Sequence, residues 1–153
     1  MILADTSVWI DHLRSGNKEL QKLLEQGQIV IHPFVIAELG LGSLRERPKT
    51  LALLDLLPQV QVARMHEVRL TIEARRLYNL GIGLIDAHLI ASVLIHPSTL
   101  LWTRDKRLRK AAEGFGLHAN LALQTTDWRS ALSLEIRAQL FPHLLHLLSR
   151  LVE

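Results

Sequence analysis

Three short apolar runs, each followed by polar residues, constrain the fold of this chain most strongly. They cover residues 2–4, 29–31 and 99–103, and each has the length and composition of a buried strand. Segments in which leucine and other apolar residues recur at helical spacing separate these runs. Because strands that alternate with helices are typical of α/β domains, we expect a mostly parallel central sheet with helices on both faces.

Glycine, proline and the apolar pattern set the expected helix boundaries. Pro33 suits the first turn of a helix that continues to residue 44, and Gly27 ends a leucine-patterned helix over residues 17–26. The segment 86–95 is apolar on nearly every side, which predicts a buried helix with Asp86 at its start. Further helices are expected from residue 7 onward and over 51–57, 66–80 and 106–112, with a short strand-like segment over 59–63.

The length of the chain indicates one domain with an extension. The 153 residues are 48% hydrophobic, which is enough to bury one core. We assign residues 1–120 to this domain and residues 121–153 to a leucine-rich helical C-terminal extension of it, which Pro142 divides into one kinked helix or two short ones. The apolar stripe of the extension would pack either on the chain's own core or on a second subunit, and the pattern leaves both open.

The composition excludes several classes of protein. Without cysteine the chain forms neither disulfides nor thiolate metal sites, which fits a reducing cytoplasm. The first apolar run stops at Asp5 with no basic segment before it, unlike a signal peptide, and the other apolar stretches are shorter than the roughly 20 residues of a membrane-spanning helix. The 18 Lys and Arg residues against 15 Asp and Glu permit a polyanionic partner without requiring one.

Four acidic residues stand in apolar surroundings. Asp5 and Asp105 follow two of the expected strands. Asp86 begins the buried helix, and Glu38 has mainly apolar neighbours one helical turn away, which predicts that its face points into the protein. Because the carboxyl ends of parallel strands lie at one edge of a sheet, we expect these acids to converge there.

Each acid also has a structural alternative. Asp86 could cap its helix, and Asp5 and Asp105 could be turn residues after strands. Asp105 could also pair with a neighbouring cation, and Glu38 with a buried arginine. When each acid is considered alone, a structural role is favoured for the three aspartates. For Glu38, the structural and the functional roles are equally favoured. Their combination favours a shared site.

Convergence of these carboxylates would require a cation. Two carboxylates about 4 Å apart repel each other by around 4 kcal/mol at an effective dielectric constant of 20. Oxygen ligands without cysteine suit Mg²⁺ or Mn²⁺, which keep several waters and are held through one or two carboxylates. Such an ion would activate a water for attack on a phosphodiester, so the sequence predicts phosphoryl-transfer chemistry.

Each of the four acids lies in a distinctive segment. The segments are Asp5-Thr6-Ser7, Val-Ile-Ala-Glu-Leu-Gly-Leu-Gly around Glu38, Leu-Ile-Asp-Ala-His-Leu-Ile-Ala-Ser around Asp86, and Leu-Trp-Thr-Arg-Asp-Lys-Arg-Leu around Asp105. Together they resemble the motif blocks of PIN domains, and the resemblance is nearest to VapC-type toxins of bacterial toxin–antitoxin pairs. The resemblance covers residues 1–118. It implies a PIN-like three-layer sandwich and a metal-dependent endoribonuclease. Such proteins are often homodimers, inhibited by a VapB-like antitoxin whose C-terminal segment occupies the site.

The resemblance also implies residue roles. The catalytic acids would be Asp5, Glu38, Asp86 and Asp105, and the supporting hydroxyls would be Ser7 and Thr103. Asp5 and Asp86 are the best candidates for Mg²⁺ or Mn²⁺ ligands. Asp105 would act as a further ligand, through water or at a second ion. The leucine-rich segment after residue 120 has no counterpart in the compact family pattern.

A basic cluster flanks Asp105. Arg104 and Lys106 lie nearest the expected site and are predicted to contact the RNA backbone. For the outer members of the cluster, Arg107, Arg109 and Lys110, a solvated helix face is favoured.

Other signals carry less weight. Trp9 and Trp102 are expected in the core rather than stacked on a base, and the eight histidines are expected at packing or surface positions rather than at a zinc site. A haloacid-dehalogenase-type phosphatase needs an aspartate where Ser7 stands, and a receiver domain needs neighbouring acids where Thr6 follows Asp5. The alternative function that remains is a PIN-like RNA- or protein-binding module with little or no nuclease turnover.

Overall fold

The computed structural model describes residues 1–96 and 98–121 of the chain. Its elements follow the order β1 (Ile2–Ala4), α1 (Thr6–Ser15), α2 (Lys18–Glu25), β2 (Ile29–Val30), α3 (Pro33–Leu41), α4 (Arg47–Asp55), α5 (Met65–Arg75), α6 (Leu84–Ile95), β3 (Leu100–Trp102) and α7 (Lys106–Gly114). Apart from residue 121, the predicted C-terminal extension lies outside the described residues. In the described part of the chain, no helix is both long and apolar enough to cross a bilayer.

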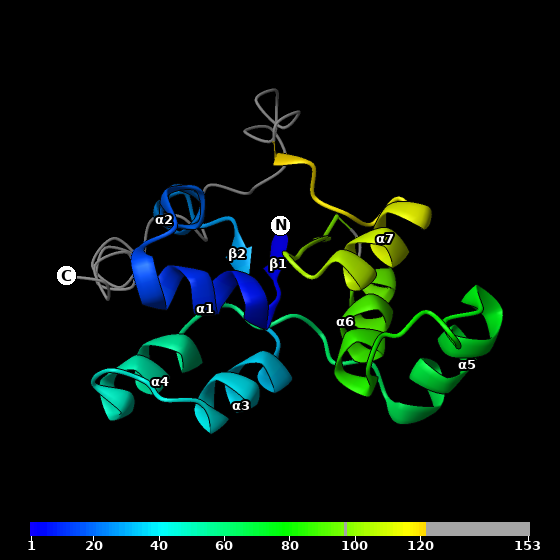
Figure 1. The fold of residues 1–153 in the computed structure, drawn as a ribbon, viewed down its shortest axis with the longest axis horizontal. Helices are drawn as coiled ribbons and strands as arrows, with labels where there is room; N and C mark the ends of the chain where they lie inside the picture. Colours follow the sequence, from blue (N-terminus) through cyan, green and yellow to red (C-terminus); the bar gives the residue numbers. More distant parts are fainter. Residues whose placement is uncertain (97, 122–153) are drawn as a thin grey trace.

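The three expected strands form one parallel sheet in the order β2-β1-β3. Leu3 pairs with Val30 on one side and with Leu101 on the other. Figure 1 shows β1 near the centre, with α1 to α4 on the side of β2 and α5 to α7 on the opposite side. Because the strands are parallel, Asp5 and Thr103 leave the sheet at the same edge, where the Asp5 N–H donates to the carbonyl oxygen of Trp102 at 2.9 Å.

Local signals in the sequence fix where the helices begin. Asn17 precedes α2, and its side-chain oxygen accepts from the N–H of Leu20 at 3.0 Å. Pro33 begins α3, where its missing N–H costs no helical hydrogen bond. Both starts agree with the sequence expectation, although α3 ends at Leu41 rather than at residue 44.

Helix α6 is the most buried helix of the described fold, as its composition predicts. Its residues 87–93 are all buried, and the helix packs against α5 and β3. Leu89 and Ile90 have no exposed surface, and full burial of such a side chain stabilises the fold by about 1.5–3 kcal/mol. Trp9 and Trp102 are also buried, which confirms their expected packing role. The start of α6 is therefore anchored by the core.

The expected strand over residues 59–63 is wrong. Only one parallel bridge forms there, between Ile31 and Gln59. The segment then turns away from the sheet, because the Ala63 N–H donates to the Ser92 hydroxyl on α6 at 3.1 Å instead of to a strand. Helices α3, α4, α5 and α6 consequently follow one another without an intervening strand, so the strict alternation read from the sequence fails in this region.

Two helix boundaries also differ from the expectation. Helix α4 begins at Arg47, before the expected residue 51, because Pro48 occupies its first turn. Helix α5 ends at Arg75 rather than at residue 80, because Arg76 adopts a left-handed conformation with φ of 52°. The segment between α5 and α6 is therefore a loop that leads directly to Asp86.

Candidate active site

Asp5 is buried at the carboxyl end of β1, and its carboxylate accepts hydrogen bonds from two side-chain hydroxyls. The Ser7 and Thr103 hydroxyls each donate to its Oδ2 atom at 2.7 Å. Thr103 follows the adjacent strand β3, so the parallel pairing of β1 and β3 brings these groups together. Oδ1 of Asp5 makes no hydrogen bond to the part of the chain that the structure describes. One carboxylate oxygen is thus fixed and the other is available to a ligand.

Glu38 lies on α3, which packs against α1. Its Oε2 accepts a hydrogen bond from the Thr6 hydroxyl at 2.5 Å, and it forms no ion pair with any described residue. The buried-arginine alternative thus finds no support among residues 1–96 and 98–121. The expectation that this helix face points into the protein holds only in part, since Glu38 is half-buried while Leu41 is 91% exposed. The sequence did not identify Thr6 as a residue of the site. Its position between Asp5 and Ser7, two predicted site residues, could have indicated it.

Asp86 and Asp105 are held by main-chain N–H groups. Asp86 is the third residue of α6, and its Oδ2 accepts from the Gly83 N–H at 2.8 Å. Asp105 is the N-cap of α7, and its Oδ1 accepts from the N–H groups of Arg107 and Leu108 at 2.8 and 2.9 Å. The capping alternative is thus correct for one oxygen of Asp86. Asp105 also caps its helix through one oxygen, a role that the sequence had not suggested for it. The other oxygen of each carboxylate has no hydrogen-bond partner among residues 1–96 and 98–121.

The electrostatics of Asp86 link it to the other three acids. Burial raises the pKa of its carboxyl group, and the hydrogen bond from Gly83 opposes this rise. Repulsion from Asp5, Asp105 and Glu38 raises the pKa further. The negative charges of the other three acids therefore act on Asp86, as expected for carboxylates near one edge of the sheet.

The described side chains do not form a complete metal cage. No group of three or more His, Asp or Glu residues among them is arranged to hold one ion. A cation bound here would be held by fewer carboxylates at a time and would complete its shell with water. That arrangement suits Mg²⁺ and Mn²⁺, which usually keep several waters and use one or two carboxylates.

Arg104 is paired within the chain. Its Nη1 atom lies 2.8 Å from Oδ1 of Asp11, and the other oxygen of Asp11 accepts from the Asn17 side chain at 2.9 Å. The Arg104 main-chain N–H donates to the Ser7 hydroxyl at 3.0 Å. Asp11 was missed in the sequence because no apolar pattern marks it. The side chain of Arg104 remains 52% exposed, so part of the guanidinium still faces solvent.

The outer basic residues of α7 agree in part with the expected solvated face, since Arg107 and Lys110 are exposed and Arg109 is half-buried. Arg109 donates to the main-chain oxygen of Thr103 at 3.1 Å, and Arg107 donates to that of Gly81 at 3.2 Å. Both guanidinium groups therefore bind the protein itself. Lys106 and Lys110 are exposed and make no hydrogen bond or ion pair to another described residue, so the expectation holds for Lys110.

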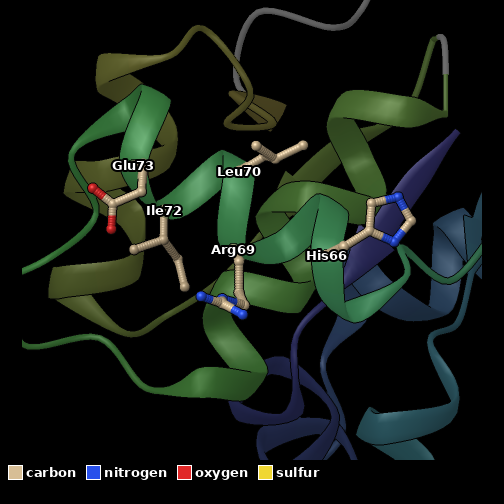
Figure 2. Close-up of a pocket in the computed structure, with 5 residues that line it drawn as sticks. All are labelled: His66, Arg69, Leu70, Ile72 and Glu73. Carbon is tan, nitrogen blue, oxygen red and sulfur yellow. The ribbon is translucent and has the colours of Figure 1, made fainter.

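A separate surface hollow of about 500 Å³ lies along α5. Figure 2 shows the residues that line it, which are His66, Arg69, Leu70, Ile72 and Glu73. None of the four acids lines this hollow. It is therefore distinct from the candidate active site.

Comparison with known proteins identifies the class that this fold and these four acids define. Residues 2–114 match the PIN domain family, and the chain belongs to that family. It is also similar to the protein named Ribonuclease VapC32 from Mycobacterium tuberculosis, in strains CDC 1551 / Oshkosh and ATCC 25618 / H37Rv. Each of these relatives is 45% identical over 117 residues, which are 76% of this chain and 94% of the relative. The expected PIN-like α/β fold and the resemblance to VapC-type proteins are confirmed.

Proposed function

We propose that this chain is a metal-dependent endoribonuclease of the VapC type, which hydrolyses RNA phosphodiester bonds at the edge of the sheet. The observation that carries this proposal is the hydrogen bonding of the four carboxylates. In each of them the chain holds one oxygen, and the other has no hydrogen-bond partner among the described residues. The ribonuclease name of the 45% identical relatives supports the same reaction.

The donor set fits Mg²⁺ or Mn²⁺. Oδ1 of Asp5 and Oδ1 of Asp86 are the first candidates for metal ligands, and Oδ2 of Asp105 would act through water or at a second ion. When bound, the ion would supply an activated water and would stabilise charge on the leaving oxygen. The four carboxylates would otherwise repel one another. Burial is the main cause of the raised pKa of Asp86, and repulsion from the other three acids adds to it.

The protein's own residues orient these acids. The hydroxyls of Ser7 and Thr103 hold Asp5, so that its free oxygen points in one direction. The Thr6 hydroxyl holds Oε2 of Glu38, and the remaining oxygen would accept a hydrogen bond from the attacking water. Such hydrogen bonds to ligand residues typically change metal affinity or activity by about 10–100-fold.

Two cations beside the site would hold the RNA backbone. Lys106 is exposed and has no partner among the described residues. Arg104 uses one nitrogen on Asp11, and a guanidinium has five N–H donors, so it retains donors for a phosphate. These contacts would offset the repulsion between the acids and the RNA.

The partners of this function follow from the family. We propose that the chain is the toxin of a toxin–antitoxin pair, forms a homodimer and is inhibited by a VapB-like antitoxin. The relatives' name VapC supports the pairing. Co-purification with the product of an adjacent short reading frame, and loss of nuclease activity in that complex, would test it.

The central experiment measures cleavage of a structured RNA by the purified chain. Activity is expected with added Mg²⁺ or Mn²⁺, should stop with EDTA, and should be lost in Asp5→Asn and Asp86→Asn while thermal unfolding stays cooperative. Asp55→Asn is the matched control, because Asp55 is exposed on α4 without a hydrogen bond or ion pair in the described structure. Undiminished cleavage by either site variant would refute the site. RNA binding without cleavage by the wild type would favour the binding-module alternative.

A further inference from the structure

The loop before α6 is tied to the start of α7 by one side chain. Nη1 of Arg107 donates to the carbonyl oxygen of Gly81 at 3.2 Å. The main-chain N–H of the same arginine donates to Oδ1 of Asp105 at 2.8 Å. Arg107 therefore contacts both Asp105 and the loop that leads into Asp86, although the two acids begin different helices.

Gly81 lies against the Arg107 side chain, with little room for a side chain of its own. Its φ of 71° lies in the left-handed region, where a side chain would be strained. A Cβ atom at this position would also meet Cδ, Nη1 and Nε of Arg107 at 3.2, 3.3 and 3.4 Å. Both the conformation and the close approach favour glycine. A Cβ atom at position 81 would strain the backbone and push the Arg107 side chain away by a few tenths of an ångström.

The same loop orients Asp86. Two residues after Gly81, the Gly83 N–H donates to Oδ2 of Asp86 at 2.8 Å. This is the single hydrogen bond that the Asp86 carboxylate makes within the described chain. The position of Gly83 therefore decides which oxygen of Asp86 is left for a ligand and where it points.

We propose that Arg107 is a positioning residue for Asp86. By holding the oxygen of Gly81, it fixes the turn 81–83, and the N–H of Gly83 then fixes the Asp86 carboxylate. Through its own N–H on Asp105, it also links the two helix starts that carry these acids. The expected effect on metal binding rests on the proposed function. The hydrogen bond between Arg107 and Gly81 does not depend on a metal.

The first test uses the metal-free protein. In Arg107→Ala, the amide proton of Gly83 should exchange with solvent about two- to tenfold faster, which is the range expected from loss of one hydrogen bond. Its NMR shift should also move toward that of an unbonded amide. Arg107→Lys, which keeps a donor, should restore part of both values. Lys110→Ala removes a cation from the same helix and should change neither, because Lys110 is exposed and unpaired among the described residues.

The second test measures Mn²⁺ binding by calorimetry and RNA cleavage at saturating and limiting metal. Arg107→Ala should raise the Mn²⁺ dissociation constant by about two- to tenfold and should lose more activity at limiting than at saturating metal. Gly81→Ala should have a similar effect, and the double variant should be little worse than either single one, because both changes break the same contact.

Two outcomes would overturn the proposal. One is a variant Arg107→Ala with unchanged Gly83 exchange and Mn²⁺ affinity but a raised KM for RNA, which would make Arg107 a backbone contact. The other is additive loss in the double variant. A wild-type protein that neither binds Mn²⁺ nor cleaves RNA would instead refute the proposed function, while the Gly83 exchange rate would still decide whether Arg107 holds the loop.

Discussion

Asp5, at the end of the central strand, and Asp86 and Asp105, at the starts of two helices, are held in different ways. Asp5 is buried and receives hydrogen bonds from two side-chain hydroxyls. Asp86 and Asp105 are more exposed and receive hydrogen bonds from main-chain N–H groups. A substitution can remove a hydroxyl directly, but it can reach an N–H only by changing the backbone. The strand-end acid should therefore be sensitive to its neighbours' side chains, and the helix-start acids to the loops before them.

Thr103→Val should produce the largest effect of the variants that test this difference. It removes the hydroxyl that donates to Asp5, and it also removes the acceptor for the Asp105 N–H at 3.0 Å. Valine has nearly the same shape, so the buried site stays filled. We expect kcat/KM for RNA to fall by about 10–100-fold, with weaker Mn²⁺ binding.

Thr103→Ser is the matched control, because it keeps the hydroxyl and deletes only a methyl group. It should retain most of the activity. Equal losses in the serine and valine variants would mean that packing at position 103, rather than the hydrogen bond to Asp5, sets the activity. The contrast between strand-end and helix-start acids would then lose its basis.

The sequence was sufficient to predict the strand-end part of the site. The apolar runs at residues 2–4 and 99–103 predicted the parallel strands that bring Asp5 and Thr103 to one edge. Strand ends can be read in this way because alternation of element types is a local property of the chain. The placement of Asp5 beside Thr103 then follows from the parallel sheet alone.

The sequence was not sufficient for the contacts that orient the acids. Thr6 reaches Glu38 across 32 residues, and Arg107 reaches Gly81 across 26. Such pairs depend on how elements far apart in the sequence pack together, which no local pattern encodes. The extra strand predicted over residues 59–63 failed for a similar reason, since Ser92 of the distant helix α6 takes the Ala63 N–H. The predicted roles of the acids remain predictions that the variants above will test.

After β2, the third strand of the sheet, the chain has a histidine, His32, where the other two strands are followed by acids. The surroundings of His32 predict that the stability of the fold depends on pH. His32 precedes α3, the helix of Glu38, and its Nδ1 accepts from the Phe34 N–H at 3.1 Å. Its Nε2 lies 3.2 Å from the Ser92 hydroxyl. Burial, and next the nearby His88, lower the pKa of His32 from 6.5 to about 4. The folded state therefore holds this ring in its neutral form.

The sign of the effect follows from the lowered pKa. Below pH 6.5 the unfolded chain binds a proton at His32 more readily than the folded one, so the free energy of unfolding should decrease as the pH falls from 6.5 to about 4. We expect this histidine to account for a loss on the order of 2 kcal/mol, measured by urea unfolding. His32→Asn keeps a capping acceptor without a titrating ring and should flatten the dependence, leaving the contribution of His88, whose pKa burial also lowers. An unchanged pH profile in this variant would assign the dependence to other groups.

Variants of Asp105 should give the smallest effect but separate its structural role from its chemical role most clearly. One oxygen of Asp105 caps α7, and the other has no hydrogen-bond partner in the described part of the chain. Asp105→Ala should destabilise the protein by about 1 kcal/mol through loss of the cap, whereas Asp105→Ser keeps a capping oxygen and should stay close to the wild type in urea unfolding. If the unbonded oxygen binds the metal, both variants should weaken Mn²⁺ binding equally despite their different stabilities. Restoration of Mn²⁺ affinity by serine would instead mean that the site needs Asp105 only to begin the helix. Asp105 would then leave the set of metal ligands, and Asp5 and Asp86 would remain.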